Sequence, residues 1–427
     1  MEYCSMSKNE LEKERKIVED KYNELKALGL KLDMSRGKPS PEQLDLSLPM
    51  LDVVNSTSDL TSSVDCRNYG VVDGIPEAKE LVAGILGVSK DEVIIFGNSS
   101  LNIMFDVVTK AVIKGIMGSE PWIKNENVKF LCPVPGYDRH FSVTEYHGIN
   151  LVNVPMTEKG PDMDIVEEYV NKDSDVKGIW CVPKYSNPDG ITYSDDVVKR
   201  MAALKPAAKD FRIYWDNAYC VHDLFPDDKD KLLDIYAECK KNGSEDMVYM
   251  FCSTSKVSFA GAGIAALAAS KANIDDILSQ LKWQTIGPDK INQLRHVRFF
   301  KDYNGILEHM KKHAELLRPK FSLVHEIFER ELGGLGIGNW TNPKGGYFIS
   351  FNSLEGCAKN IVKTAKEAGV VLTGAGATFP YGKDPKDSNI RIAPSYPSLD
   401  ELEKATELFT ICVRLVTLNK LLGEKSN

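Results

Sequence analysis

Short apolar runs alternate with amphipathic stretches along most of the chain. The apolar runs predict buried strands at residues 91–96, 128–132, 149–154, 177–182, 212–215, 247–252 and 263–269. Helical patterns lie between several of them, at residues 77–84, 101–116, 164–170, 195–204 and 274–282. Short apolar strands that alternate with helices indicate an α/β fold, in which helices cover both faces of a mostly parallel sheet. We therefore expect a mostly parallel, seven-stranded sheet.

The two ends of the chain follow a different pattern. Residues 7–28 are rich in helix formers, and Ile17, Tyr22, Leu25 and Leu28 form a candidate apolar stripe. A long helix at about 304–331 is expected to leave the sheet domain. The remainder predicts a small α+β domain, with strands or helices at 344–351, 355–368, 370–373, 390–393 and from 399 onward. We therefore predict a large domain at 50–305 and a small domain formed by 1–49 and 306–427.

Composition excludes several classes of partner. Of the 427 residues, 43% are hydrophobic and 27% are charged, which is ordinary for a globular enzyme. The net charge of −8 argues against nucleic acid or an anionic membrane as the main partner. No run has the length of a membrane span, and the N-terminus lacks an apolar signal core. We expect neither nucleic-acid nor membrane binding.

The cysteines and histidines show no metal-binding pattern. The nine cysteines are scattered, without Cys-x-x-Cys or a Cys/His cluster, which predicts reduced thiols in a cytoplasmic protein and no metal site. His309 and His313 share a helical face, but they flank Lys311 and Lys312 and are expected to be solvated.

Polar residues follow the predicted strands. In a parallel sheet, ligands bind beyond the carboxyl ends of the strands. One such residue follows each of five strands, and the fold rule brings all of them to one rim: Ser99, Tyr137, Asn187, Asp216 and Ser253. The Gly97–Ser100 turn before a helix is also a typical phosphate cradle, because free N–H groups and the helix dipole both favour an anion.

One lysine stands out at this rim. The run Ser253-Thr254-Ser255-Lys256 ends a strand and precedes the glycine-rich residues 259–263. A buried lysine is costly unless paired or neutral, and a desolvated lysine is a good imine-forming nucleophile. A lone loop lysine is usually solvated, but Asn187-Pro188, Asp216 and Tyr219 precede this one in order, and Arg391 follows it.

This ordered set resembles the fold-type-I aminotransferases that use pyridoxal phosphate. The runs Ser-Arg-Gly-Lys-Pro at 35–39, Pro-Gly-Tyr-Asp-Arg-His at 135–140 and Ser-Lys-Val-Ser-Phe-Ala-Gly-Ala-Gly at 255–263 are most similar to a divergent bacterial branch of aspartate aminotransferases. The resemblance covers the chain from about residue 30. It implies a homodimer with shared active sites, and amino-acid and 2-oxo-acid substrates.

The resemblance assigns three residues to catalysis. Lys256 matches the lysine that holds pyridoxal 5'-phosphate as a Schiff base and then serves as the base for the Cα proton. Asp216 matches the carboxylate that keeps the pyridine nitrogen protonated, although an aspartate here could also cap a helix. Tyr219 and Asn187 match the pair that binds the ring hydroxyl oxygen, although Asn187-Pro188 also fits a plain turn.

Other positions match binding residues of the family. Tyr137 matches the aromatic residue that stacks on the pyridine ring, and Arg391 the arginine that grips the substrate α-carboxylate as a bidentate fork. The residues that match phosphate contacts are Asn98, Ser99, Ser100, Ser253 and, toward the neighbouring subunit, Tyr69. In the turn-rich loop at 34–41, Gly37 permits close backbone approach to a ligand and Arg36 offers charge to a substrate.

Aspartate:2-oxoglutarate transamination is the expected function. A different amino donor or β-elimination on the same scaffold stays open, because the fold cannot separate these reactions. A non-catalytic sensor of a transcription regulator is a further alternative. It is disfavoured because only some 30 residues precede the matched region and they contain no basic helix-turn-helix.

One position departs from the family pattern. Gly263 stands where most members have an arginine that pairs with the cofactor phosphate. A phosphate with nearly two negative charges needs more than hydroxyls and backbone N–H groups if it is held away from water. We expect a replacement cation from Lys290, Arg295 or, third, Arg36, unless the glycines only tighten the turn.

Overall fold

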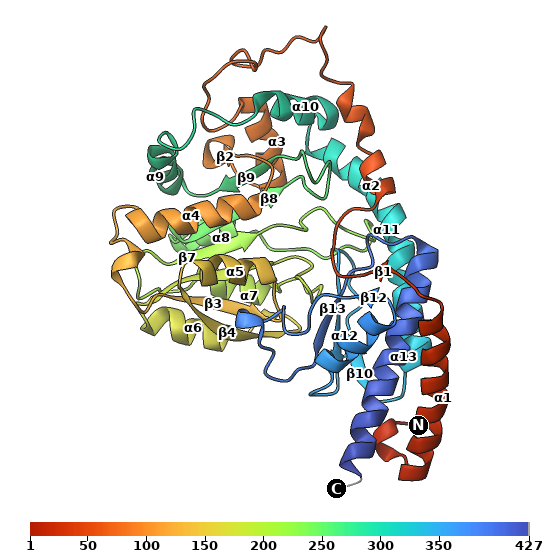
Figure 1. Cartoon of the computed structure of the whole chain (residues 1–427). Coiled ribbons are helices and arrows are strands. Elements are labelled where there is room, and N and C mark those ends of the chain that lie inside the picture. Colours follow the sequence, from red (N-terminus) through yellow and green to blue (C-terminus); the bar gives the residue numbers. More distant parts are fainter. Residues whose placement is uncertain (426–427) are drawn as a thin grey trace.

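An eight-stranded sheet is the centre of the larger part of the molecule (Figure 1). The computed structural model describes residues 1–425. The strand order is β2-β9-β8-β7-β6-β3-β4-β5. The strands are β2 (Val93–Ile95), β3 (Lys129–Val134), β4 (Asn150–Thr157), β5 (Gly160–Pro161), β6 (Val176–Cys181), β7 (Arg212–Asp216), β8 (Val248–Ser253) and β9 (Ala265–Ala268).

The predicted parallel sheet is confirmed, with one additional strand. Strands β4, β3, β6, β7 and β8 pair in parallel, and β9 runs antiparallel to both of its neighbours, β8 and β2. The eighth strand is the two-residue β5, which pairs antiparallel with the end of β4 at the sheet edge. It is too short to give an alternating sequence pattern.

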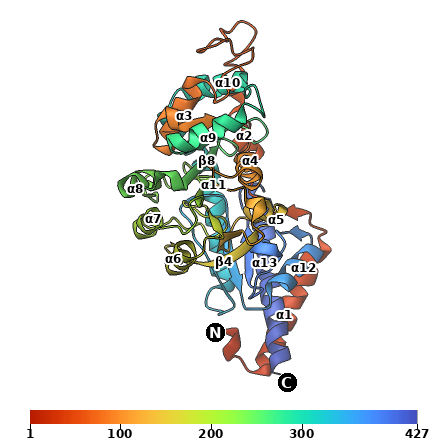
Figure 2. The ribbon, with the colours of Figure 1, turned by 90° about the vertical axis from the view of Figure 1, so that its left-hand side faces the viewer.

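Helices cover both faces of this sheet (Figure 2). One apolar core joins a sheet face to α3 (Pro76–Leu86), α6 (Met163–Lys172), α7 (Asp195–Ala202), α8 (Ile235–Asn242) and α10 (Lys290–Phe300). The core on the other face includes α4 (Ser100–Lys114), α5 (Asp138–Tyr146) and α9 (Lys271–Leu281). Because both faces are buried, the central strands are apolar throughout rather than alternating.

A smaller α+β part packs beside the sheet, and both ends of the described chain lie at its far end (Figure 1). Its sheets are β10-β11-β13 (Gly338–Trp340, Ile349–Ser353, Asn389–Ile392), which is antiparallel, and the parallel pair β1-β12 (Leu32–Asp33, Val370–Val371). Its helices are α1 (Lys8–Ala27), α12 (Ala358–Glu367) and α13 (Leu399–Glu424), and one core cluster joins them. The short α2 (Pro41–Asp45) follows β1.

One helix contributes to two of the apolar clusters. Helix α11 (Tyr303–Leu332) confirms the long helix expected at 304–331. Near its start, Ile306 and Met310 pack with Val257, whereas Phe321 and Phe328 lie in the core of the smaller part. Helix α11 therefore packs against both the loop that carries Lys256 (the lysine loop) and the core of the smaller part.

The domain boundaries at 50–305 and at 1–49 with 306–427 stay a prediction.

The apolar stripe expected for α1 was right for Tyr22 and Leu25 and wrong for Ile17 and Leu28. Ile17 is 53% exposed and Leu28 is 63% exposed, whereas Leu11, Val18 and Tyr22 are buried against the small-domain core. The packed face therefore runs Leu11-Val18-Tyr22-Leu25, which keeps two residues of the expected stripe and has Val18 in place of its neighbour Ile17. Packing against α13 decides which face of α1 is buried, and the sequence of α1 alone does not show where α13 lies.

The expectation that His309 and His313 are solvated was also wrong. Their exposed fractions are 6% and 1%, because the face of α11 that carries them packs under the lysine loop and α2. The charged neighbours Lys311 and Lys312 point the other way and are exposed.

Among residues 1–425, no helix is long and apolar enough to cross a membrane.

The two neighbouring positions on α1 give a matched test of its packing. Val18→Asp places a charge at a fully buried position and should lower the free energy of unfolding by ~3 kcal/mol or more. Ile17→Asp, one residue earlier on the exposed face, should change it by less than ~0.5 kcal/mol. Urea unfolding of both variants measures the difference. Equal losses would place the packed face elsewhere.

Candidate active site

A cavity of about 570 Å³ opens at the carboxyl ends of the parallel strands. The larger part contributes residues from the loops after β2, β3, β6, β7 and β8, and the smaller part contributes the loop at 35–38, Phe348, Thr373 and Arg391. The predicted rim residues all line it: Ser99, Tyr137, Asn187, Asp216 and Ser253. So do five more of the predicted site residues: Lys256, Tyr219, Ser100, Gly37 and Arg36, together with Arg391 from β13.

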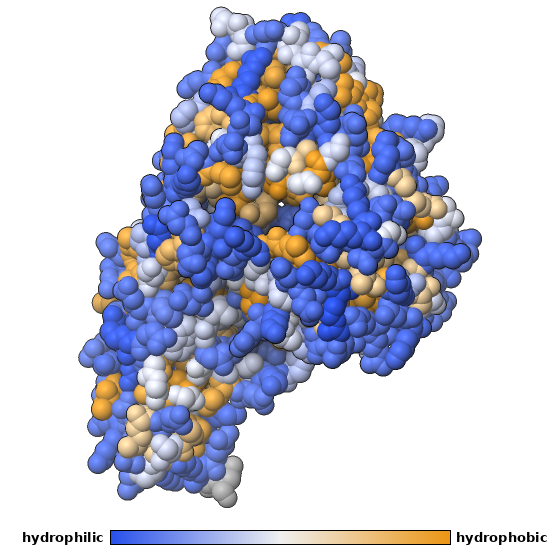
Figure 3. Space-filling view, turned by 180° about the vertical axis from the view of Figure 1, so that it is seen from behind, coloured by the Kyte–Doolittle hydropathy of each residue, from blue (hydrophilic) through white to orange (hydrophobic). Residues whose placement is uncertain are grey.

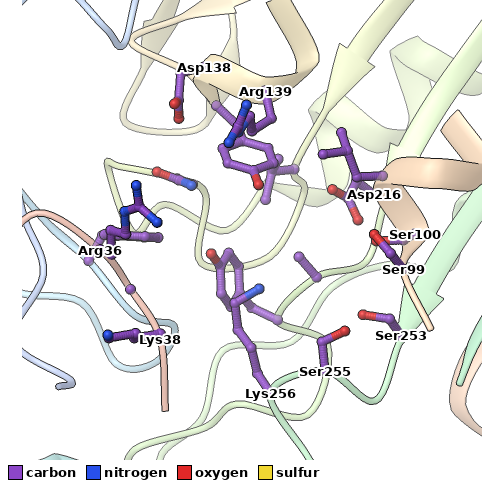
Figure 4. Close-up of a pocket in the computed structure, with 18 of the residues that line it drawn as sticks. Arg36, Lys38, Ser99, Ser100, Asp138, Arg139, Asp216, Ser253, Ser255 and Lys256 are labelled. Carbon is purple, nitrogen blue, oxygen red and sulfur yellow. The ribbon is translucent and has the colours of Figure 1, made fainter. Parts of the chain in front are cut away.

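Lys256 projects into this cavity from the turn after β8 (Figure 4). Its Nζ lies 5.1 Å from the centre of the Tyr219 ring and makes no hydrogen bond or ion pair within residues 1–425. Burial lowers the pKa of the Lys256 amine, and the nearby Asp216 carboxylate opposes this shift only in part. A larger fraction of this amine is neutral, and hence nucleophilic, than for an ordinary surface lysine.

Asp216 ends β7 and is 3% exposed. Its Oδ2 accepts a hydrogen bond of 2.9 Å from His140 Nε2, and the His140 ring stacks on Trp180 with centroids 4.6 Å apart. Its Oδ1 is buried and has no donor among the described residues. A buried carboxylate oxygen without a donor is costly, so this atom is suited to receive a proton donor from a bound molecule.

Hydroxyl groups gather on one side of the cavity, where Figure 4 shows Ser99, Ser100, Ser253 and Ser255. Ser99 is the N-cap of α4, yet its side chain makes no capping bond, so its hydroxyl is available. The amino end of α4 adds unpaired N–H groups and a positive dipole. Asn98 does not line the cavity: its side chain donates to the Gly261 carbonyl, and its own carbonyl accepts from Ser255.

Arg391 lies on the side that the smaller part contributes, and it is 7% exposed. Its Nη1 donates to Asp138 Oδ1 at 2.9 Å and to Asn187 Oδ1 at 3.2 Å, and its Nη2 donates to Thr373 Oγ1 at 3.3 Å. Its Nε is buried without an acceptor in the described chain. The guanidinium therefore keeps an unsatisfied edge for an anion.

Phe348 fixes the distance between Arg391 and the loop at 35–38. The guanidinium carbon lies 4.8 Å from the ring centre, and the outer edge of the ring packs against Gly37. A Cβ at position 37 would lie 2.4 Å from Phe348 Cζ, so the backbone can approach this closely only as glycine. The close approach predicted for Gly37 is made to a side chain that supports Arg391.

Three further cations surround the opening of the cavity: Arg36, Lys38 and Arg139. Arg36 and Lys38 lie across from the serines (Figure 4). The side chains of Arg36 and Arg139 make no hydrogen bond or ion pair with the part of the chain that the structure describes, whereas Lys38 Nζ sits 3.8 Å over the Tyr396 ring. Together with Lys256 and Arg391, they outnumber the two carboxylates Asp138 and Asp216, so the cavity favours anions.

Two tyrosines face the cavity from the larger part. Tyr137 lies at the amino end of α5, with its ring edge against His140, and burial raises its pKa to about 12. Tyr219 follows Asp216, and burial raises its pKa well above the ordinary value of 10. Both phenols therefore stay protonated near neutral pH and can donate hydrogen bonds.

Several residues that shape the site were missed in the sequence, chiefly His140, Asp138, Phe348 and Thr373. His140 stands three residues after Tyr137, and this helical spacing was the one signal available. The contacts of Asp138 and Thr373 with Arg391 join positions far apart in the chain. Such contacts leave no local pattern.

Position 263 has no room for a side chain. A Cβ on Gly263 would lie 2.8 Å from Thr254 Oγ1, and the Gly263 carbonyl accepts a hydrogen bond of 2.9 Å from Asn292 Nδ2. The candidate replacement cations Lys290 and Arg295 do not line this chain's cavity, and they donate to the carbonyls of Gly70 and Ala262. Tyr69 is also outside the cavity and is 79% exposed.

Known proteins share this architecture over the whole chain. The family model for aspartate amino-transferase matches residues 6–425. An aspartate aminotransferase of Corynebacterium glutamicum is 46% identical over 400 residues, covering 93% of this chain and 92% of the relative.

Solved structures agree with these matches. An aspartate transaminase from C. glutamicum superposes with a TM-score of 0.95 at 43% identity over 99% of each chain. At 19% identity, α-aminoadipate aminotransferase from Thermus thermophilus, solved with N-(5'-phosphopyridoxyl)-L-leucine, shares the fold with a TM-score of 0.73 and coverage of 92% and 93%. The chain is an aminotransferase and belongs to the aspartate aminotransferase family.

Proposed function

We propose that this aminotransferase holds pyridoxal 5'-phosphate at Lys256 and transfers amino groups between aspartate and 2-oxoglutarate. The observation that carries the proposal is that the Lys256 amine lies in the same cavity as Asp216, whose Oδ1 lacks a donor among the described residues. A protonated pyridine nitrogen would satisfy that oxygen, and the carboxylate would keep the nitrogen protonated. When bound, pyridoxal phosphate supplies an electron sink for the pair left when the substrate Cα loses its proton.

The residues around Lys256 have complementary tasks in this proposal. Lys256 would form the covalent link through its amine and, as a free amine, would accept the Cα proton. His140 donates to Asp216 and so fixes the direction of that carboxylate. Tyr219 and Asn187 would bind the ring hydroxyl oxygen, and Tyr137 would cover a ring face. Ser99, Ser100 and Ser253 would hold the phosphate at the amino end of α4.

The distribution of charge supports a dicarboxylic substrate. Aspartate and 2-oxoglutarate each carry two carboxylates, and the cavity has cations on the side away from the serines. Arg391 would bind the α-carboxylate through its unsatisfied edge, as a bidentate fork. Arg36, which has no partner within residues 1–425, would bind the side-chain carboxylate.

We also propose a homodimer with shared sites. Tyr69 and the nearby apolar side chains Trp283 and Ile286 are 79%, 84% and 62% exposed, and Lys290 joins their two segments by donating to the Gly70 carbonyl. Figure 3 shows hydrophobic residues among hydrophilic ones on the face seen from behind. In the dimer, Tyr69 would reach the partner's phosphate, and Lys290 or Arg295 would supply the cation missing at Gly263. Arg36 is the weaker candidate because it lies opposite the serines.

The nine free cysteines support a reducing, cytoplasmic location.

A direct assay tests the activity: the purified protein, supplied with pyridoxal phosphate, should convert aspartate and 2-oxoglutarate to oxaloacetate and glutamate faster than it uses leucine or alanine as donor. A preference for an apolar or cationic amino donor would contradict the substrate assignment.

Lys256→Ala should reduce transamination by at least about 10⁴-fold, because both the covalent link and the proton acceptor are lost. The variant should still bind pyridoxal phosphate noncovalently, which equilibrium dialysis measures. Lys271→Ala, an exposed lysine paired with Asp275 on α9, is the control and should keep full activity. Normal turnover by Lys256→Ala would remove this residue from the mechanism.

Arg391→Lys should raise the KM for aspartate and lower kcat/KM by about 10- to 100-fold, because lysine keeps the charge but loses the bidentate fork. Steady-state kinetics with both substrates measure the change. Arg15→Lys, at an exposed position on α1, is the control. If the two variants behave alike, Arg391 does not bind the α-carboxylate.

A further inference from the structure

Two buried histidines contact the peptide backbone at the base of the Lys256 side chain. His222 Nε2 lies 3.3 Å from the carbonyl oxygen of Lys256, and His309 Nε2 lies 2.9 Å from the carbonyl oxygen of Val257. Both imidazoles are almost fully buried, with exposed fractions of 3% and 6%. Consecutive carbonyls on the lysine loop therefore each accept a hydrogen bond from a side chain outside that loop.

The two histidines come from different parts of the chain. His222 follows Tyr219 in the segment after β7, and its ring lies edge-on between Tyr219 and Tyr347. His309 belongs to α11, the helix that also packs in the core of the smaller part. The loop is therefore anchored to two rigid elements rather than only to its own turn.

Both contacts require a proton on the histidine Nε2, because a carbonyl oxygen can only accept. Burial lowers the pKa of both rings, and the charge of Lys256 lowers that of His222 further. The groups that face His222 are Lys256, Lys184, His313 and the two tyrosines, and within residues 1–425 no carboxylate forms a hydrogen bond or ion pair with its ring. The rings act as fixed donors and do not carry charge into the site.

The same cluster reaches the loop that bears Arg36. Ser47 Oγ lies 3.2 Å from His309 Nε2, and His313 Nε2 lies 3.2 Å from the same atom. On its other side, His313 Nδ1 lies 3.1 Å from the Gln43 amide nitrogen, which donates to the Tyr347 hydroxyl. Gln43 belongs to α2, directly after the 35–38 loop. One buried polar network thus connects the segment after the 35–38 loop, which bears Arg36, to the backbone next to Lys256.

We infer that His222 and His309 are positioning residues for Lys256. In the proposed reaction, the lysine amine must hold the cofactor and then stand where it can accept the Cα proton. The histidine bonds keep the peptide stationary, so that only the side chain moves between these tasks. Placement within about 1 Å matters for such a transfer, and neither residue touches the reacting atoms. This inference rests on the proposed function.

The test replaces the donor while keeping the ring. His222→Phe, in the full chain with pyridoxal phosphate, should lower kcat about 10-fold, as expected for the loss of one hydrogen bond that holds a reacting group. KM for aspartate should stay within about twofold, because Arg391 is unchanged. The rate at which the apo-protein attaches pyridoxal phosphate covalently, followed by absorbance in rapid mixing, should fall by a similar factor.

A matched set separates positioning from stability. His222→Gln keeps an N–H donor at the same reach and should recover most of both rates, whereas His325→Phe on the far part of α11 should change neither. His309→Leu and His309→Gln repeat the comparison at the next carbonyl and decide the question if His222→Phe does not fold.

Unchanged kcat and unchanged attachment rates in His222→Phe and His309→Leu would overturn the inference. So would equal losses in the Gln and the apolar variants, because the N–H donor would then be irrelevant. If the wild-type chain itself attached no pyridoxal phosphate, the proposed function would fail first, and this inference with it.

Discussion

The site depends on the partial desolvation of one amine. Lys256 is half-buried in the cavity and lacks an ion-pair partner among the described residues, so desolvation moves its pKa downward and makes the nucleophile available. This state is costly, and the surrounding structure sustains it. The parallel strands bring Asp216 and the serine cluster to one rim, two histidines fix the lysine backbone, and Tyr219 covers the amine.

The cavity combines two surfaces of different origin. The sheet rim offers hydroxyls and helix N–H groups, whereas the smaller part contributes Arg391 and the loop at 35–38 with Arg36. Anions of different kinds can therefore bind at opposite ends, with Lys256 between them. Helix α11 and the Gln43–His313–His309 contacts connect the two surfaces mechanically, so the separation between lysine and arginine is set by packed elements rather than by mobile loops.

The sequence predicted much of this because its signals were local. Asp216 and Ser253 end their strands, and Ser99, Tyr137 and Asn187 lie in the loops after theirs; a general rule for parallel sheets gathers such residues. Residues that act through a distant partner were missed: His140 meets Asp216 across 76 positions, and Asp138 meets Arg391 across 253. The errors have the same origin, because the phase of the α1 stripe and the burial of His309 depend on elements packed against them. Asn98 was assigned to the phosphate turn by position, yet it caps the glycine-rich loop.

The most direct test of the account is chemical trapping at the lysine. The protein, incubated with pyridoxal phosphate and reduced with borohydride, should carry one phosphopyridoxyl group per chain, and peptide mapping should locate it on Lys256. Aspartate added before reduction should prevent the labelling, because it converts the cofactor to a form that is no longer attached to the chain. Labelling spread over surface lysines, or labelling of Lys256 that aspartate does not affect, would contradict the account.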